Sequence, residues 1–439
     1  MDSLIINGGK KLIGNIPISG SKNACLPMMI ASLMTDEKMT LNNIPMLSDV
    51  KTLISILKSL GTNIEYKKDN LHLHTKEIIN HKASYDLVKK MRASFWVLAP
   101  LIAKKGSAEV SLPGGCAIGT RPIDIYLKML KEMNIKFSIN NGYIVAKAES
   151  PISGINFKLE KKSVGCTHFF LMLACLATGT SKLSNAACEP EVVHLGMLLN
   201  KMGAKIKGLG SKKIIIEGVK KLNGINEIVP SDRIEAGTFA IAVSATGGKI
   251  KLENSNYDEN KTLFRILEKT GSKINKSKNS ISIEKMNDEI YPVNIKTSPY
   301  PGFPTDLQAQ IMTLMAISNG KSEIKENIFE NRFMHVQELV RMGANIKLNK
   351  AIKQEAIESL KLKLLTAFME VEQLLYLDNS YRIQLNALET AKRQALETYN
   401  LSKERYDKGL ASLELVLNSQ RQYNDSRSQF LVLKRQKLN

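Results

Sequence analysis

The chain has 439 residues, 43% of them hydrophobic, and a formal net charge of +20. This length suits two or three domains that each bury an apolar core, and the hydrophobic fraction excludes an intrinsically disordered chain. The 62 basic residues are dispersed, without a dense run that alternates with aromatic residues. We therefore expect no nucleic-acid partner.

The N-terminus and the cysteines indicate a cytoplasmic protein. Residues 1–9 have neither the basic start nor the long apolar segment of a secretion signal. The longest apolar run, around 169–177, is too short to cross a bilayer, so we expect no membrane insertion. The 5 cysteines include no C-x-x-C pair, and His72 and His74 lack a third ligand, so we expect free thiols and no metal site.

A short phrase recurs roughly every 70 residues along the first part of the chain. Each copy combines an apolar helix end, a glycine or asparagine, and a short segment with strand character. The copies span residues 57–64, 130–136, 199–206, 267–274 and 340–346. Because Gly and Asn tolerate the left-handed backbone of a helix C-cap, each copy predicts a helix end that leads into a strand. Alternating segments such as 212–218 predict a hairpin after that strand.

The composition changes after this repeated region. A sixth copy would place its glycine near about residue 412, and the sequence has none there. Between Ala351 and Asn439 there is no proline and only one glycine, Gly409. Apolar residues at helical spacing predict two long amphipathic helices that break at Gly409.

A glycine-rich loop at 111–122 places Cys116 five residues before Arg121. Such a loop is typical of a mobile lid, and a nearby guanidinium would favour the thiolate and bind phosphate. An inert cysteine in an ordinary loop explains the spacing equally well.

Three further positions suggest binding or catalysis. Lys22 and Asn23 follow a glycine turn and precede an apolar helical stretch, where a helix N-terminus would attract an anion. A surface lysine beside a helix cap is the alternative. Asp306 follows two prolines at a predicted helix start, where it would act as a general base or as a helix cap.

Six motifs, taken together in their order and spacing, resemble the enolpyruvyl transferase family, in the branch that serves peptidoglycan synthesis. They are Ser-Lys-Asn-Ala at 21–24, Met-Arg-Ala-Ser-Phe-Trp at 91–96, Leu-Pro-Gly-Gly-Cys-Ala-Ile-Gly-Thr-Arg-Pro at 112–122, Ser-Asp-Arg-Ile-Glu-Ala-Gly-Thr-Phe at 231–239, Phe-Pro-Thr-Asp-Leu-Gln-Ala-Gln at 303–310 and Phe-Glu-Asn-Arg-Phe-Met-His at 329–335.

The resemblance covers about residues 1–348 and implies an α/β fold, a two-domain inside-out α/β barrel of repeated βαβα-hairpin units. It implies one complete three-repeat domain at 22–230. A second, discontinuous domain would comprise 1–21 and 231–348 and would lack the sixth repeat. Residues 349–439 would follow as a long all-α helical hairpin.

The family's reaction transfers the enolpyruvyl group of phosphoenolpyruvate to the 3′-hydroxyl of UDP-N-acetylglucosamine, without a metal or organic cofactor. The resemblance implies that Cys116 is a lid cysteine open to fosfomycin-like epoxides, that Asp306 is the base, and that Lys22 is catalytic. Lys22, Arg92 and Arg121 would hold phosphoenolpyruvate. The residues implied to contact the nucleotide sugar are Asn23, Lys161, Ser163, Val164, Gly165, Asp306 and Ile328.

The family's last repeat also supplies an Asp-Leu-Arg motif and a later arginine, which have no counterpart here, so we expect little or no transferase activity. Residues 357–439 resemble the last helical hairpin of TolC-type outer-membrane efflux proteins; a plain amphipathic coiled coil is the alternative. Three hypotheses stay open: a cytoplasmic transferase, or a non-catalytic chimera derived from it, that carries a foreign tail; an efflux-type interaction module with a vestigial enzyme domain; and an accidental fusion of two reading frames near 348–357. The helical tail would also allow self-association.

Overall fold

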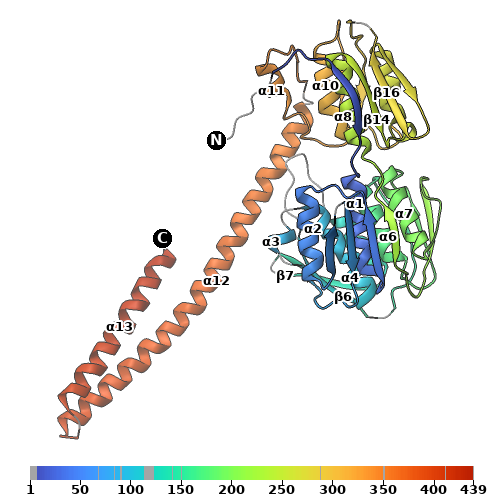
Figure 1. The fold of residues 1–439 in the computed structure, drawn as a ribbon. Coiled ribbons are helices and arrows are strands. Elements are labelled where there is room, and N and C mark those ends of the chain that lie inside the picture. Colours follow the sequence, from blue (N-terminus) through green and yellow to red (C-terminus); the bar gives the residue numbers. More distant parts are fainter. Residues whose placement is uncertain are drawn as a thin grey trace. The chain divides into compact units, whose positions relative to one another are not determined.

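The chain forms two compact units, Met1–Ile346 and Lys347–Asn439 (Figure 1). The computed structural model describes residues 7–67, 69–83, 85–88, 91–112, 123–140, 142–149, 151–286, 288–349, 352–410 and 412–438. The first unit combines helices with mixed sheets, and most described residues of the second lie in two long helices. The expected α/β class with C-terminal helices is therefore confirmed.

Four sheets of the described residues share one strand order. In each, an edge strand pairs parallel with a central strand, and the central strand pairs antiparallel with the second strand of a hairpin. The first sheet has the order β13 (Ile225–Ile228), β2 (Lys38–Asn42), β4 (Asn70–His74) and β3 (Asn63–Lys67), and the second has the order β5 (Lys82–Ala83), β6 (Ser107–Ser111), β8 (Tyr143–Ala148) and β7 (Ile135–Asn140). The third sheet has the order β9 (Asn156–Lys158), β10 (Thr180–Ser184), β12 (Lys213–Glu217) and β11 (Lys205–Lys207). The fourth sheet has the order β1 (Leu12–Pro17), β14 (Gly248–Glu253), β16 (Ser280–Lys285) and β15 (Ser272–Lys276).

A fifth sheet differs from these four. It contains only β17 (Ile295–Lys296) and β18 (Ile324–Lys325), which pair in parallel. No described residue adds a hairpin to it. The prediction that the fifth copy of the recurring phrase leads into a strand is therefore wrong. Residues 344–349 follow the turn at Gly343 without forming a strand. A strand needs a partner for its backbone groups, and no strand of the described residues lies beside this segment.

The left-handed turns predicted from the recurring phrase are confirmed at all five positions. The φ angles are +110° at Gly61, +57° at Asn134, +106° at Gly203, +102° at Gly271 and +97° at Gly343. Each turn lies just beyond the C-terminus of a helix. Glycine and asparagine occupy these positions because other residues meet a steric penalty there.

The helices of the first unit either cover the sheets or lie between them. They are α1 (Lys22–Ile30), η1 (Ala31–Met34), α2 (Ser48–Ser59), α3 (Tyr85–Val88), η2 (Arg92–Val97), α4 (Leu98–Lys105), α5 (Asp124–Glu132), α6 (Val164–Ala174), α7 (Pro190–Lys201), α8 (Arg233–Thr246), η3 (Tyr257–Asn260), α9 (Lys261–Lys269), η4 (Thr305–Leu307), α10 (Gln308–Ala316) and α11 (Val336–Arg341). None of the described helices is long and apolar enough to span a bilayer.

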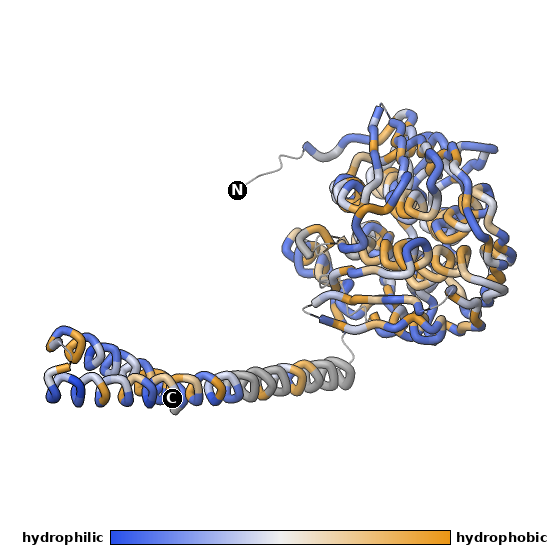
Figure 2. Tube along the Cα trace, turned by 90° about the horizontal axis from the view of Figure 1, so that it is seen from below, coloured by the Kyte–Doolittle hydropathy of each residue, from blue (hydrophilic) through white to orange (hydrophobic). Residues whose placement is uncertain are grey.

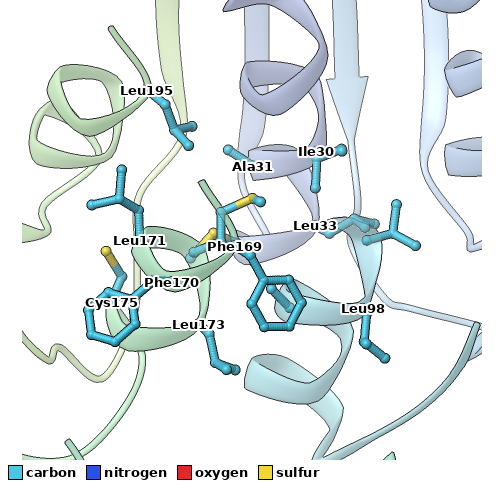
Figure 3. Close-up of a cluster of buried hydrophobic side chains, with 14 of the residues drawn as sticks. Ile30, Ala31, Leu33, Leu98, Phe169, Phe170, Leu171, Leu173, Cys175 and Leu195 are labelled. Carbon is cyan, nitrogen blue, oxygen red and sulfur yellow. The ribbon is translucent and has the colours of Figure 1, made fainter. Parts of the chain in front are cut away.

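Buried side chains of the first unit form two hydrophobic clusters. The larger one draws its residues from Ala24 to Val229, and the smaller one from Ile18 and from Ala236 to Met315. Helix α6 lies inside the larger cluster, and its apolar residues face every direction, as expected of a helix with no exposed side. Figure 3 shows the Phe169 ring of α6 pointing toward Leu33 of η1 and Leu98 of α4.

Two chain segments connect the clusters, from β1 to α1 and from β13 to α8. They meet at an antiparallel bridge between Gly20 and Ser231. A Cβ atom at Gly20 would lie 1.9 Å from the backbone oxygen of Asn43, so only glycine fits at this crossing. The ends of α1 and α8 are therefore fixed next to each other.

The second unit is a helical hairpin of α12 (Ile352–Asp407) and α13 (Leu413–Leu438). Gly409 has a φ of +73° between the helices, which confirms the predicted break. The Tyr399 and Tyr423 rings stack with centroids 6.5 Å apart, and Ala395 and Val416 are buried. Figure 2 shows hydrophobic segments concentrated inside the first unit, whereas hydrophilic and hydrophobic residues alternate along these helices.

Candidate functional site

A cavity of about 460 Å³ opens where α1 and α8 begin, and we call it the α1–α8 pocket. It brings together Lys22, Asn23 and Asp306, three of the residues expected from sequence to act on substrate. Its lining residues are Lys22, Asn23, Leu47, Asp232, Ile234, Glu235, Thr238, Phe239 and Asp306. They come from segments more than 280 positions apart in the chain, so the pocket exists only in the folded protein.

Lys22 is the first residue of α1, directly after the cap formed by Ser21. The Ser21 hydroxyl accepts a hydrogen bond from the Ala24 backbone N–H. The Lys22 ammonium forms an ion pair with Asp49 at 3.2 Å, and its backbone N–H donates to Asp232 at 3.4 Å. A helix N-terminus and an ammonium group both favour an anion, so this end of the pocket can hold a phosphate or carboxylate.

Asp306 does not cap a helix, so that interpretation of the sequence is wrong. It lies within η4, and neither η4 nor α10 has a side-chain cap. Its carboxylate instead accepts a hydrogen bond from the Arg332 guanidinium at 2.8 Å. Both side chains remain partly exposed, so the carboxylate oxygens can also reach a molecule in the pocket. This geometry suits a group that accepts a proton from a hydroxyl.

Glu326 organises the loop beside Asp306. One of its oxygens accepts hydrogen bonds from the Thr297 hydroxyl at 2.9 Å and from the Ile328 backbone N–H at 2.8 Å. The other oxygen accepts from the Thr305 hydroxyl at 2.9 Å. Ile328 is therefore connected through one carboxylate to the residue that precedes Asp306.

Sequence reasoning gave Arg332 and Glu326 no role. Arg332 stands within the motif at 329–335, which supported the family resemblance, and that motif was its only indication. No sequence pattern indicated a role for Glu326, because its partners Thr297 and Thr305 lie 29 and 21 positions away in the chain.

Asp232 closes the other side of the α1–α8 pocket. It caps α8 by accepting hydrogen bonds from the backbone N–H groups of Ile234 at 2.7 Å and Glu235 at 3.2 Å. Glu235 in turn accepts from the Ser19 backbone N–H at 3.0 Å. Asp232 and Glu235, at the start of α8, therefore hold the start of α1 close to it through hydrogen bonds with Lys22 and Ser19.

A buried ion pair joins the starts of α7 and α8. The Arg233 guanidinium donates to both Glu191 oxygens, at 3.1 and 3.4 Å, and the two side chains are 10% and 6% exposed. Burial raises the pKa of Glu191, and Arg233 opposes that rise. The Tyr300 ring lies 6.0 Å from the Arg233 guanidinium, so an aromatic side chain also borders this pair.

The predicted nucleotide-sugar segment lies at the start of α6. The Ser163 hydroxyl caps this helix by accepting from the Cys166 backbone N–H, and Val164 and Gly165 form its first turn. A Cβ atom at Gly165 would lie 2.5 Å from the Tyr126 hydroxyl and 3.0 Å from the Trp96 indole nitrogen. Lys161 is exposed just before this turn. The lining of the α1–α8 pocket does not extend to this segment or to Ile328.

Two predicted residues, Cys116 and Arg121, lie outside the described residues. Arg92 begins η2, and its side chain is likewise outside the described part. The described cysteines are all buried free thiols: Cys25, Cys166, Cys175 and Cys188. Burial raises the pKa of Cys25 and of Cys175 to about 12, so these two thiols are unsuited to nucleophilic or acid-base chemistry.

Residues 6–366 match the family model described as EPSP synthase (3-phosphoshikimate 1-carboxyvinyltransferase), and the chain belongs to this family of enolpyruvyl transferases. Among solved structures, the enolpyruvyl transferase NikO from Streptomyces tendae has a TM-score of 0.71 at 18% identity, covering 79% of this chain and 82% of that one. EPSP synthase from Acinetobacter baumannii has a TM-score of 0.57 at 18% identity, covering 73% and 75%. Both likenesses show the enolpyruvyl transferase fold.

Curated relatives are more similar in sequence. One from Bartonella tribocorum, named UDP-N-acetylglucosamine 1-carboxyvinyltransferase, is 52% identical over 361 residues, which span 80% of this chain and 84% of the relative. A protein of the same name from Chelativorans sp. is 48% identical over 367 residues, spanning 81% and 85%. These names denote an enzyme, which agrees with the sequence prediction.

Proposed function

We propose that the chain is built to transfer the enolpyruvyl group of phosphoenolpyruvate to the 3′-hydroxyl of UDP-N-acetylglucosamine. The single observation that supports this most directly is the 52% identity to a relative that bears the name of this activity. The α1–α8 pocket adds independent support, since it places an ammonium, an amide and a carboxylate around one cavity.

In the proposed reaction, the sugar hydroxyl oxygen adds to C2 of phosphoenolpyruvate while C3 gains a proton, giving a tetrahedral intermediate. The C2–O bond to phosphate then breaks and C3 loses a proton, which restores the double bond. Asp306 accepts the hydroxyl proton, and Cys116 acts from the lid in proton transfer and product release. Charged groups that converge on the phosphate and carboxylate stabilise the charge that develops.

The remaining roles follow the resemblance. Lys22, Arg92 and Arg121 hold phosphoenolpyruvate. The nucleotide sugar is held by Asn23, Lys161, Ser163, Val164, Gly165, Asp306 and Ile328. The N-cap turn at the start of α6 supports a diphosphate site, because backbone N–H groups at a helix start attract anions.

We further propose that the chain contains a complete domain at 22–230 and an incomplete one formed by 1–21 and 231–348. The two hydrophobic clusters support this division, since the larger one contains residues 24–229 and the smaller one residue 18 with residues 236–315. Because the last repeat is missing, turnover of the chain alone is far below that of a complete homologue.

The test measures substrate binding and turnover of the purified full chain separately. Calorimetry with UDP-N-acetylglucosamine is expected to show binding, and the Lys161→Ala and Asp306→Ala variants are expected to weaken it. Phosphate release from phosphoenolpyruvate is then measured beside the Bartonella tribocorum relative. Absence of nucleotide-sugar binding contradicts the proposed substrate, whereas turnover near that of the relative contradicts the proposed impairment.

A second candidate function is a non-catalytic interaction module in which the TolC-like tail associates with itself. The supporting observation is that Lys347–Asn439 forms a compact unit separate from the first. Light scattering of the full chain tests it. A mass that rises with concentration and falls to that of a monomer after removal of 352–438 supports the module, and a monomer at all concentrations contradicts it.

A further inference from the structure

The five left-handed turns allow the same position to be compared within one molecule. In the first four copies, the residue immediately before the Gly or Asn is buried: Leu60 is 0% exposed, Met133 1%, Met202 0% and Thr270 3%. In the fifth copy, Met342 is 76% exposed. One local sequence pattern therefore has two quite different surroundings.

The helix position three residues earlier shows the same difference. It is occupied by a fully buried leucine in the first four copies and by the half-buried Leu339 in the fifth. The four buried residues are Leu57, Leu130, Leu199 and Leu267. In each of these copies the helix contacts the hairpin strand that follows it: α2 with β3, α5 with β7, α7 with β11, and α9 with β15. The hairpin is what covers this face of the helix.

The strand beside the fifth copy is correspondingly short. β18 has 2 residues and pairs along one edge with β17. Its counterparts β2, β6, β10 and β14 have 5 or 6 residues and pair along both edges. In the described residues no strand pairs with the second edge of β18, so its backbone groups there are open to another strand.

We propose that this second edge of β18, together with Leu339 and Met342, binds an antiparallel β-hairpin supplied by another polypeptide. We call this surface the open edge. The existing hairpins define the chemistry of that partner. The strand next to the central strand carries two apolar residues in alternate positions, each at most 1% exposed: Leu71 and Leu73, Ile144 and Ala146, Ile214 and Ile216, Ile281 and Ile283. Main-chain hydrogen bonds would provide affinity, and these two side chains would provide specificity.

Docking of this hairpin would complete the smaller hydrophobic cluster, and its effect on activity rests on the proposed function. Binding itself does not, because it is measured without substrate. The probe is the C-terminal segment of the Bartonella tribocorum relative from its counterpart of Ala344 onward, because that relative is 52% identical to this chain over 361 residues.

The experiment titrates this segment into the purified full chain by calorimetry. We expect a one-to-one complex, and we expect hydrogen exchange to slow at residues 324–328 and 339–346. Met342→Glu is expected to weaken binding at least about tenfold, because a charge would be buried against apolar side chains. Met342 is exposed in the free chain, so this variant should fold normally. Met197→Glu, at an exposed position of α7, is the matched control and should bind like the parent chain.

No binding, or binding that Met342→Glu leaves unchanged, overturns the proposal. Self-association of the full chain that Met342→Glu abolishes also overturns it, because a second copy would then be the occupant. Phosphate release is measured in the purified complex as a separate readout. A stable complex without turnover leaves the open edge as proposed and counts against the proposed function.

Discussion

The Arg332 guanidinium holds the Asp306 carboxylate through an ion pair of 2.8 Å. The Arg332 guanidinium also lies 5.5 Å from the Phe329 ring, which limits its freedom to turn away. Glu326 fixes the loop between these residues by accepting hydrogen bonds from both Thr305 and Ile328. The proposed base is therefore oriented from two directions before any substrate binds, which lowers the cost of reaching a productive geometry.

Asp306→Asn should lower enolpyruvyl transfer by about 100- to 10,000-fold, the usual contribution of a general base. The amide keeps the shape of the side chain but cannot accept the proton. Phosphate release with enzyme in excess over substrate measures the effect, with Asp288→Asn at an exposed loop as the control. If Asp306→Asn retains a rate within about threefold of the parent chain, Asp306 is not the base.

Gly165→Ala should destabilise the first unit by about 1–3 kcal/mol, the typical cost of overpacking a filled site. The new methyl group would lie 2.5 Å from the Tyr126 hydroxyl and 3.0 Å from the Trp96 indole nitrogen. Trp96 is the only tryptophan in the chain, so a shift of its fluorescence maximum should accompany the lower melting temperature. Gly8→Ala is the control, because nothing lies within 4 Å of that position. Equal melting temperatures for the two variants would contradict the tight packing described here.

His168 should make stability depend on pH. It is fully buried, and burial lowers its pKa from 6.5 to about 4. The unfolded chain therefore binds more protons than the folded chain between these pH values. The contribution of His168 to the free energy of unfolding is therefore fully present above about pH 6.5 and is lost as the pH drops toward 4. A shift of this size corresponds to about 3 kcal/mol. Urea midpoints measured across this range should fall less steeply for His168→Gln than for the parent chain.

His81→Gln, an exposed substitution, is the control for that experiment and should retain the parent slope. Because carboxylates also titrate in this range, only the difference in slope between variants is informative. Identical slopes for His168→Gln and the parent chain would show that His168 does not contribute.

Removing one partner of the Arg233–Glu191 pair should cost about 3–5 kcal/mol, because the other charge is left buried without a partner. Glu191→Gln tests this by chemical denaturation. The double variant Glu191→Gln with Arg233→Met should regain much of the loss, since no charge is then left alone. Glu217→Gln is the control, because its ion pair with Lys205 is exposed and should contribute less than about 1 kcal/mol. Equal losses for the single and double variants would argue against a coupled pair.

Local sequence was a good guide where structure depends on a few neighbouring residues. The left-handed turns at Gly61 and Gly203 follow from the lack of a Cβ atom, and the helix break at Gly409 has the same origin. The capping of α1 by Ser21 likewise depends on residues three positions apart. Lys22, Asn23 and Asp306 were expected to act together on the strength of the family motifs, and the fold places them around one pocket.

Tertiary structure alone decided the features that depend on distant segments. The sequence suggested a helix cap at Asp306, but its carboxylate pairs with Arg332, 26 positions away. The turn at Gly343 matches its four counterparts locally, yet no strand follows it among the described residues, and Met342 is exposed where Met202 is buried. A residue's propensity determines which local conformation is available to it, whereas burial and pairing require a second segment to supply the partner atoms.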